Sequence, residues 1–525
     1  AYDIASCLVG SEMCIRDSYI TTPIYYPSAK PHMGHAYSSI IADFFARLKR
    51  IQGFNVYFLT GTDEHGQKIQ RAAEEKKMDP LLFCDEISKT FRDLSDTLNL
   101  SNNDFIRTTE KRHAKSVENL WNILEKKGEI YLSKYSGWYS VSDEAFYTES
   151  EIEDLDGIKK SISSGSKVEW VEEESYFFKL SNWQDRLVDF YNKNPDFILP
   201  ETRKNEVISF VKSGLKDLSV SRKSFNWGIK VPSNKDHVIY VWLDALTNYL
   251  SALNYPNESD DLYKSFWPAD LHLIGKDILR FHAIYWPAFL LAADIEPPKR
   301  VFGHGWILSG DEKMSKSKGN ILDPLEIIEN YGLDPLRYYL IKEVSFGNDG
   351  NISQEKLESC INSDLANNYG NLCQRVLAFC DKNANLEVPD IDNLTEDDKI
   401  ILDQYSKYYD DLVKYSDNQD VNSYINFIVE QLFSANKYFN DQEPWKKKND
   451  KLRMNTIIYV ALELIRKVTI LLYPIIPSSS LKVLGIFGIN EEKINFVTIK
   501  ENNYLKKGLK LSKLDILFKK IEKND

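Results

Sequence analysis

The first clear stretch of the chain combines short apolar segments with one long segment of helical period. Residues 19–26, YITTPIYY, are β-branched and aromatic, which favours a buried strand. After the turn PSAKPHMGH, apolar residues recur at helical spacing from Ile40 to Ile51, and Gly53 predicts the end of that helix. NVYFLTGTDEHG predicts a second strand that runs into a polar loop. Strand, helix and strand in this order predict a parallel-sheet α/β domain.

The pattern changes further along the chain. Between about Gly128 and Trp227, short segments such as WYSVSDEAFY and KVEWVEEESYFFKL predict an inserted α+β domain. The α/β pattern resumes at HVIYVWLDAL, and KRVFGHGWIL predicts one more strand before the polar loop SGDEKMSKSKGN. After about Gly350 the pattern is almost wholly helical, which predicts a helical bundle. We therefore expect six ranges: a disordered or non-native extension (1–17), the first half of the α/β domain (18–127), the insertion (128–226), the second half (227–305), a loop-bearing connector (306–362) and an α-helical domain (363–525).

Length, charge and cysteine usage narrow the class of protein. The 525 residues allow about three domains, and we find no run of about eighteen uncharged apolar residues that would predict a transmembrane helix. The net charge of -12 argues against a non-specific nucleic-acid binder, although lysine-rich stretches at 446–448 and 506–523 are either local basic patches or ordinary solvated surface. The six cysteines form no CxxC pair, so we expect neither a disulfide framework nor a zinc knuckle. We therefore expect the protein to work in a reducing cytoplasm.

The motif His32-Met33-Gly34-His35 stands at the predicted turn from strand to helix. Two histidines three residues apart face the same way at a helix N-terminus, and Gly34 permits a close approach to the backbone. The free N–H groups and the helix dipole favour an anion there. The motif is typical of a phosphate site, although an isolated HxxH is more often a surface pair.

A second motif, Lys313-Met314-Ser315-Lys316-Ser317, lies in the polar loop that follows the last predicted strand. Two lysines on a flexible loop can neutralise the charge that develops as pyrophosphate leaves a triphosphate. Taken alone, the pentapeptide is equally consistent with an ordinary charged surface loop. The two motifs together, one after the first strand and one after the last, are far more specific than either.

This pair resembles the HIGH and KMSKS signatures of class I aminoacyl-tRNA synthetases. Within that class the chain resembles the methionyl-tRNA synthetase family, in segments that occur in order from residue 19 to about 445. They are TTPIYYPSAKPHMGHAYSSIIADF, FLTGTDEHGQKIQRAA, VWLDALTNYL, IGKDILRFHAIYWPAFL, HGWILSGDEKMSKSKGN, DLANNYGNLCQR and EPW. The resemblance implies a Rossmann-like catalytic domain split by an insertion, followed by an α-helical anticodon-binding domain. It implies activation of methionine with ATP and Mg²⁺ and its transfer to initiator and elongator tRNA(Met).

The resemblance also assigns site residues. His32, His35, Lys313 and Lys316 would be catalytic, with Lys316 stabilising the departing pyrophosphate. ATP would also meet Gly34, Gly275, Asp277, His304 and Gly305. The methionine site would comprise Ile24, Tyr26, Asp63, Trp242, Ala245, Leu246, Tyr249, Ile278 and His282. A thioether pocket needs polarisable aromatic edges, and Asp63 would pair with the substrate ammonium.

The helical domain is expected to read the anticodon. By resemblance, Asn371 and Arg375 would bond base edges and Trp445 would stack on a base, as single-stranded RNA loops are commonly recognised. Many relatives bind zinc in the insertion, but here Ser140 and Asp143 stand in place of a cysteine pair, so we predict a zinc-free insertion. We also expect a monomer, because we find no OB-fold after about Lys510, and no obligate protein partner.

Three other classes of protein share some of these features. A cysteinyl-tRNA synthetase would be expected to hold zinc in its pocket, for which the cysteines are missing. A small nucleotidyltransferase shares HxGH but needs no helical anticodon domain. A tRNA-binding scaffold that has lost catalysis is disfavoured by the intact HMGH, GTDEHG and KMSKS segments. The insertion of about 100 residues is too short for the editing domain of the leucine, isoleucine and valine enzymes, so selection would depend on the pocket.

Overall fold

The structure, a computed structural model, describes residues 16–143, 145–155, 157–309, 312–313 and 323–522. Contacts divide the chain into two compact units. We call Asp17–Ala42 with Tyr57–His304 the sheet unit, and residues 1–16 and 43–56 with Gly305–Asp525 the helical unit. Residues 1–15 of the predicted extension and most of the KMSKS loop lie outside the described residues.

A six-stranded sheet is the framework of the sheet unit. Its strands, in spatial order, are β3 (Asp104–Arg107), β2 (Phe54–Thr62), β1 (Arg16–Thr21), β14 (Leu271–Gly275), β15 (Val301–His304) and β9 (Ile198–Leu199). The pairs β2–β3, β1–β14, β14–β15 and β15–β9 are all parallel. The predicted parallel α/β fold is therefore confirmed.

The order of the strands alone indicates which edge of the sheet binds a ligand. From β1 the chain moves to β2 and β3 on one side, whereas β14 and β15 lie on the other side of β1. The order therefore reverses between β1 and β14. Parallel sheets bind ligands at such a switch point, beyond the carboxyl ends of the strands. The segments that leave β1 and β14 at that end are residues 22–26 and 275–282.

Two details of the sheet differ from the sequence expectations. The strand β1 begins at Arg16, so residues 16 and 17 of the predicted extension are part of the sheet. The short edge strand β9 falls within 128–226, the range expected to be an insertion, yet it pairs with β15 of the main sheet. A two-residue strand carries no readable alternation, which is why its pairing was not predicted.

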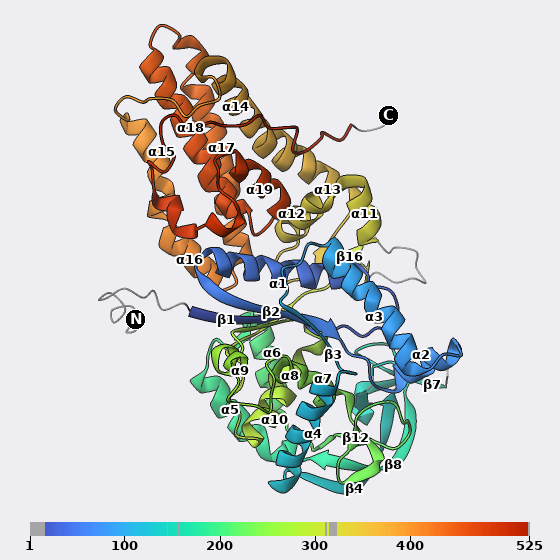
Figure 1. The fold of residues 1–525 in the computed structure, drawn as a ribbon. Helices are drawn as coiled ribbons and strands as arrows, with labels where there is room; N and C mark the ends of the chain where they lie inside the picture. Colours follow the sequence, from blue (N-terminus) through green and yellow to red (C-terminus); the bar gives the residue numbers. More distant parts are fainter. Residues whose placement is uncertain (1–15, 144, 156, 310–311, 314–322, 523–525) are drawn as a thin grey trace. The chain divides into compact units, whose positions relative to one another are not determined.

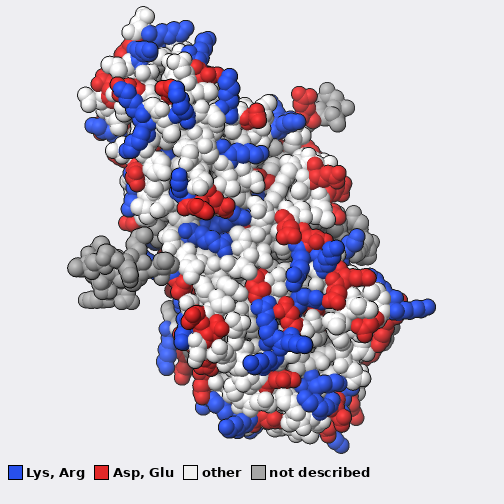
Figure 2. All heavy atoms as spheres, viewed as in Figure 1, with Lys and Arg blue, Asp and Glu red and all other residues white. Residues whose placement is uncertain are grey.

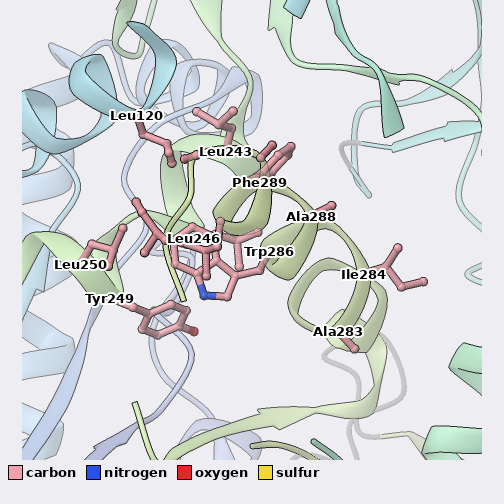
Figure 3. Close-up of a cluster of buried hydrophobic side chains, with 14 of the residues drawn as sticks. Leu120, Leu243, Leu246, Tyr249, Leu250, Ala283, Ile284, Trp286, Ala288 and Phe289 are labelled. Carbon is pink, nitrogen blue, oxygen red and sulfur yellow. The ribbon is translucent and has the colours of Figure 1, made fainter. Parts of the chain in front are cut away.

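The helices of the sheet unit cover this framework. They are α1 (Met33–Ile51, whose second half belongs to the helical unit), α2 (Gln67–Glu75), α3 (Pro80–Thr97), α4 (Lys111–Lys126), α5 (Gln184–Lys193), α6 (Glu201–Lys212), α7 (Val241–Leu246), α8 (Asn248–Ser251), α9 (Asp261–Phe266) and α10 (Trp286–Ala292). Side chains of α4, α7, α8 and α10 share one apolar cluster, in which Leu246, Tyr249 and Trp286 are buried (Figure 3). The candidate residues Leu246 and Tyr249 are therefore part of a packed core.

The inserted region has its own antiparallel sheet, ordered β10 (Leu218–Ser219), β8 (Glu169–Phe178), β4 (Ile130–Ser140) and β5 (Ala145–Tyr147). The long pair β4–β8 keeps one register from Ile130↔Phe178 to Tyr139↔Glu169. A hairpin of β6 (Ile152–Leu155) and β7 (Ile158–Ser161) follows. A small sheet of β11 (Ser221–Arg222), β13 (Asn234–Ile239) and β12 (Lys230–Val231) leads into α7.

The helical unit begins with a small sheet of β17 (Glu312–Lys313), β16 (Ile307–Ser309) and β18 (Gly350–Asn351). Its helices are α11 (Pro324–Tyr331), α12 (Leu333–Glu343), α13 (Gln354–Cys360), η6 (Ile361–Gly370), α14 (Asn371–Ala384), α15 (Glu396–Lys407), α16 (Tyr409–Asp417), α17 (Val421–Asp441), η7 (Pro444–Lys446), α18 (Lys451–Leu472), α19 (Pro477–Ile486), η8 (Glu491–Lys493) and η9 (Phe496–Lys500). α18 is buried continuously from Thr456 to Leu472, with α14, α15, α17 and α19 packed around it (Figure 1). The predicted bundle is confirmed.

A buried charge cluster holds the second half of α1 within the helical unit. Arg337 on α12 donates from Nη2 to Asp43 Oδ2 at 2.7 Å, and Arg47 donates to the same oxygen at 2.8 Å. Arg337 also donates from Nε to the carbonyl of Ile475 at 2.9 Å. A buried carboxylate shared by two guanidinium groups fixes the register of these elements, because removing one partner leaves an unpaired buried charge.

None of the helices in the described part of the chain is long and apolar enough to cross a membrane. On the face drawn in Figure 2, lysine and arginine side chains are interspersed with acidic ones rather than gathered into one broad basic area.

Candidate functional site

The methionine candidates come from four segments of the sheet unit, one of which is the segment after β2 that carries Asp63. Ile24 and Tyr26 follow β1, Ile278 and His282 follow β14, and Trp242 and Ala245 lie on α7. Trp242, Ala245, Leu246 and Tyr249 are spaced i, i+3, i+4 and i+7, so they share one helical face. Ile24, Tyr26, Trp242 and Ile278 are partly buried at the edge of the apolar cluster that contains Leu246 and Tyr249. The predicted set is thus gathered around one core.

A hydrogen-bonded chain connects three of these residues. The Tyr249 hydroxyl lies 2.8 Å from His282 Nε2, and His282 Nδ1 lies 3.0 Å from the carbonyl oxygen of Ile278. A carbonyl only accepts, so Nδ1 carries the proton and Nε2 accepts from Tyr249. Burial lowers the pKa of His282 to about 4, so the ring is neutral at pH 7. The polar groups satisfy one another and leave an uncharged wall.

Behind Tyr249 lies a second buried histidine, which sequence analysis did not select. The rings of Tyr249 and His272 stack with centroids 4.0 Å apart, and His272 Nδ1 lies 2.8 Å from Thr21 Oγ1. Burial, and then the neighbouring His282, lower the pKa of His272 well below its usual value. His272 lies in the middle of β14, where an apolar residue is the usual expectation, so the sequence pattern carried no signal for it.

Trp242 forms the other aromatic surface of this region. Its ring stacks on Phe281 with centroids 3.5 Å apart and an interplanar angle of 6°. The indole N–H is buried and has no hydrogen-bond partner in the part of the chain that the structure describes. Both rings are only partly buried, at the edge of the cluster. Stacked rings with accessible edges offer the polarisable contacts that a thioether prefers.

Asp63 is the only carboxylate among the methionine candidates, and it is nearly buried just after β2. Its backbone N–H donates to the carbonyl of Tyr25 at 2.9 Å, while the N–H of Tyr25 donates to Gly61 at 2.8 Å. Tyr26 donates from its hydroxyl to the carbonyl of His65 at 2.8 Å. These bonds join the segments that follow β1 and β2. They bring Asp63 close in space to Tyr26, as the predicted site requires.

The HMGH motif occupies the start of α1, as predicted. The rings of His32 and His35 lie with centroids 3.8 Å apart. The N–H of His32 donates to His35 Nδ1 at 3.1 Å, and the N–H of Gly34 donates to His32 Nδ1 at 3.0 Å. A Cβ on Gly34 would lie 2.9 Å from the His32 ring, so a larger residue here would displace that exposed ring. Burial, and then His32, lower the pKa of His35 well below its usual value.

The nucleotide candidates at the ends of β14 and β15 adjoin this turn. Gly275 and His304 are register partners in the sheet. His304 Nε2 lies 2.8 Å from Ser38 Oγ, one turn after the HMGH motif on α1. Ser38 donates to the carbonyl of Gly34 at 3.2 Å, so it accepts from His304. A Cβ on Gly275 would lie 2.5 Å from Asp277 Oδ1, so glycine makes room for that carboxylate.

Gly305 and the two loop lysines belong to the helical unit. A Cβ on Gly305 would lie 2.1 Å from the backbone of Asn348, so only glycine fits this close approach. The backbone of Lys313 is in β17 and pairs with Leu308. Lys316 lies outside the described residues.

The anticodon candidates share one surface of the helical unit. Asn371 and Arg375 are one turn apart on α14, and Trp445 lies in η7. The guanidinium of Arg375 lies 5.7 Å from the centroid of the Phe439 ring, and the Trp445 ring meets the same ring at 6.2 Å, edge on. Arg375 donates to Asn440 Oδ1 at 2.6 Å. Trp445 is 39% exposed, which is unusual for so large an apolar ring.

Comparison with known proteins decides the family. A model of class I tRNA synthetases of the methionyl type, described as "tRNA synthetases class I (M)", matches residues 18–157 and 157–377, and one of the anticodon binding domain of methionyl tRNA ligase matches residues 388–525. The chain belongs to the methionyl-tRNA synthetase family. It is 50% identical over 511 residues to the methionine–tRNA ligase of Rickettsia conorii, covering 96% of this chain and 99% of that one. It is 50% identical over 483 residues to the Brucella suis methionine–tRNA ligase, covering 92% of this chain and 93% of that one.

Solved methionyl-tRNA synthetases agree with this result. The Mycobacterium tuberculosis enzyme in complex with methionyl-adenylate superposes with a TM-score of 0.94 at 44% identity, covering 96% of this chain and all of that one (100%). The free-state structure of that enzyme gives a TM-score of 0.87 at 40% identity, covering 98% of this chain and 100% of that one. The predicted family, fold class and enzyme class are confirmed.

The insertion contains a carboxylate in a shell of hydroxyl groups. Asp143 accepts hydrogen bonds from Tyr147 at 2.7 Å, from Ser166 at 2.6 Å and from Ser164. Its own N–H donates to Ser140 Oγ at 3.2 Å. Burial alone would raise the pKa of Asp143, but the hydroxyl donors outweigh burial and lower it. No group of three or more His, Cys, Asp or Glu side chains suited to a metal occurs among the described residues.

Proposed function

We propose that the chain activates methionine in the sheet unit and recognises tRNA through the helical unit. The observation that carries the first half is the chain from Tyr249 through His282 to Ile278 at the switch point of the sheet. Every polar group in it is neutral and satisfied internally. Such a wall accepts an unbranched thioether and leaves the polar groups of a hydroxylated or charged side chain without partners.

The substrate's charged end has a separate partner. Asp63 binds the methionine ammonium in a charge-assisted pair, and its backbone bond to Tyr25 fixes where that charge sits. His32 and His35 on the first turn of α1 contact ATP phosphates, with the helix N–H groups adding positive potential. Gly275, Asp277 and His304 hold the nucleoside at the ends of β14 and β15.

The reaction then needs positioning and charge stabilisation rather than a covalent enzyme intermediate. A carboxylate oxygen of methionine forms a bond to the α-phosphorus of ATP, and the bond from that phosphorus to the bridging oxygen breaks to release pyrophosphate. Lys313 and Lys316 stabilise the departing charge, and Mg²⁺ enters bound to the phosphate oxygens of ATP. A terminal ribose hydroxyl of tRNA next attacks the methionyl carbonyl, loses its proton and displaces AMP.

Methionine-dependent exchange between ATP and pyrophosphate tests this assignment. Lys316→Ala should slow exchange by about 10²–10³-fold, the usual effect of losing a stabilising charge in a transition state. Lys318→Ala, in the same loop, is the matched control and should retain exchange within about twofold. Equal loss in both variants would mean that the loop acts only through its overall charge. Unchanged exchange in Lys316→Ala would remove this lysine from the mechanism.

Recognition of the anticodon is assigned to the surface formed by Asn371, Arg375 and Trp445. An exposed indole beside a guanidinium that is held over Phe439 offers one stacking platform and one base-edge donor. The surrounding lysines at 446–448 add phosphate contacts. We also propose that the protein is a monomer and works in a reducing compartment, and sedimentation velocity at micromolar concentration tests the first of these.

We further propose that the insertion keeps its shape without zinc, through the hydroxyl shell of Asp143. The shell supplies donors from two segments to one carboxylate: Tyr147 is the last residue of β5, and Ser164 and Ser166 follow β7. Metal analysis of the purified protein should find less than about 0.1 zinc per chain. Stoichiometric zinc would contradict the proposal. Asp143→Ala should lower the free energy of unfolding by about 1–3 kcal/mol, because three hydroxyl donors lose their acceptor.

A further inference from the structure

A buried charged cluster lies directly behind the proposed methionine site. Asp244 on α7 is fully buried, with Oδ2 2.7 Å from His65 Nδ1 and Oδ1 2.7 Å from His113 Nε2. His65 follows Asp63 by two residues, and His113 lies on α4. Neither histidine nor Asp244 has a role in the proposed chemistry. A buried carboxylate between two imidazoles is costly unless each hydrogen bond is made, so the cluster needs an explanation.

The hydrogen bonds assign the protons in this cluster. The Ser251 hydroxyl lies 2.9 Å from the carbonyl oxygen of Thr247 and 3.0 Å from His113 Nδ1. His113 Nε2 faces a carboxylate oxygen, which only accepts, so that nitrogen carries a proton. Burial alone would raise the pKa of Asp244, but His65 and His113 outweigh burial and lower it to about 2, so the carboxylate is ionised. His65 and His113 thus both bond a buried, ionised carboxylate.

Helix geometry places this pair opposite the site. Trp242, Ala245 and Leu246 share the pocket face of α7, and Asp244 is on the other face, two residues after Trp242. Ser251 follows Asp244 by seven residues, on the same side, where both meet His113. The cluster consequently fixes the rotation of α7 about its axis. Rotation of α7 is what aims Trp242 and Ala245 toward substrate.

The other arm of the cluster reaches the loop that carries Asp63. His65 bonds Asp244, while the neighbouring Glu64 is buried and accepts a bidentate pair from Arg107 at 2.7 and 3.0 Å. The carbonyl of Glu64 also accepts from Trp227 Nε1 at 2.6 Å. Two of three consecutive side chains are thus anchored in the core. The direction of the third, Asp63, is fixed by those anchors.

We propose that His65, Asp244 and His113 are positioning residues that hold the carboxylate of Asp63 and the aromatic face of α7 in register with each other. The inference rests on the proposed roles of Asp63 and Trp242 in methionine binding. Because the cluster connects two segments of the methionine site, its loss raises KM for methionine. The first turn of α1, which is proposed to bind ATP, has no bond to the cluster among the described residues.

The test compares two substitutions at His65. In His65→Asn, the amide nitrogen occupies the place of Nδ1 and keeps the bond to Asp244. In His65→Leu, similar volume is kept and the bond is lost. Exchange kinetics with each substrate varied in turn should show KM for methionine raised about tenfold or more in His65→Leu. KM for ATP should stay within about twofold in both variants, and His65→Asn should stay within about threefold of the parent for methionine.

Asp244→Asn gives a second measurement at the centre of the cluster. An amide can accept from His65 through its oxygen and donate through its nitrogen to His113 in its other tautomer, so the hydrogen bonds survive while the charge of the carboxylate disappears. KM for methionine should rise less than about threefold, whereas Asp244→Leu, which removes the bonds, should behave like His65→Leu. Thermal unfolding of each variant shows which of them fold.

The possible outcomes separate the inference from the function on which it rests. If His65→Leu lowers kcat or the melting temperature but leaves both KM values unchanged, the cluster is only structural and the inference is wrong. Equal increases in both KM values would also overturn it. If the parent protein itself shows no methionine-dependent exchange, the proposed function fails first and the inference with it. A selective rise in KM for methionine that Asn at position 65 prevents supports the inference.

Discussion

The methionine candidates and the anticodon candidates are built in opposite ways. In the sheet unit, Tyr249 and His282 are fully enclosed, and each polar atom that joins them has an internal partner. In the helical unit, Trp445 is partly exposed and Arg375 is held by one amide and one aromatic face. A small apolar side chain can be selected only by a wall that is complete before it arrives, whereas a base in an RNA loop brings its own stacking face and hydrogen-bonding edge.

This contrast predicts that substitutions at the two sites affect different reactions. Changes in the sheet unit should alter amino-acid activation without tRNA. Changes on the anticodon surface should alter charging of tRNA and leave activation intact. The expected effects decrease from the loss of a buried charge, through the loss of a stacked ring, to the loss of one neutral hydrogen bond.

The largest effect is expected from Asp63→Asn. The amide keeps the shape of the side chain but removes the charge that pairs with the substrate ammonium, so KM for methionine in exchange should rise about 10²-fold or more. KM for ATP and the affinity for tRNA should change less than about threefold. An equal effect on both substrates would place Asp63 outside the methionine site.

The second largest effect is expected from a substitution on the anticodon surface. Trp445→Ala should raise KM for tRNA in aminoacylation about 10–100-fold, because a stacked base contributes about 1–3 kcal/mol. Exchange without tRNA should be unchanged. Trp170→Ala is the matched control, since Trp170 is 51% exposed on β8 of the insertion. Similar losses in the two variants would show that exposed tryptophans in general, rather than this one, affect tRNA charging.

A smaller effect is expected from Tyr249→Phe. This change removes only the hydroxyl that donates to His282 Nε2 and leaves the ring stacked on His272. KM for methionine should rise about 3–10-fold, since one neutral hydrogen bond contributes about 0.5–1.5 kcal/mol. Selection against amino acids with polar side chains should weaken, because Nε2 of His282 becomes available as an acceptor. Unchanged selectivity would mean that the chain from Tyr249 to Ile278 does not define the pocket.

The smallest effect near neutral pH is the change in the free energy of unfolding that follows from protonation of buried histidines. The pKa of His282 is about 4 in the folded protein, below its usual value of 6.5, and those of His35 and His272 are also well below it. Between pH 6.5 and 4 the unfolded chain therefore binds protons that the folded chain does not. The free energy of unfolding should fall as pH decreases through this window. Thermal melts across the window measure it, and His282→Gln should show a shallower decline.

Much of the fold and of the candidate site could be predicted, because the sequence motifs occur at the strand and helix ends that the hydrophobic pattern predicts. The βαβ start, the helical third of the chain and the position of HMGH on α1 follow from hydrophobic period and turn residues. The methionine candidates were selected through family resemblance, and the structure brings together candidates from the segments after β1, β2 and β14 and from α7 and α8. Such convergence depends on strand order, which the period of a sequence does not encode.

What could not be predicted is of two kinds. The strand β9 is too short to show alternation, and only its pairing with β15 identifies it. The cluster of His65, Asp244 and His113 has two bonds between residues far apart in the sequence. The bond from His65 to Asp244 spans 179 positions, and the bond from His113 to Asp244 spans 131 positions. A buried histidine and a surface histidine look alike in one sequence. Only the packing of α4 and α7 distinguishes them.

Exchange between ATP and pyrophosphate with each of the twenty amino acids, in the absence of tRNA, tests the central claim most directly. The account predicts that methionine alone supports exchange, and that Trp445→Ala supports it at the same rate. Exchange with a different amino acid would contradict the proposed pocket. A loss of exchange in Trp445→Ala would contradict the division of activation and anticodon recognition between the two units.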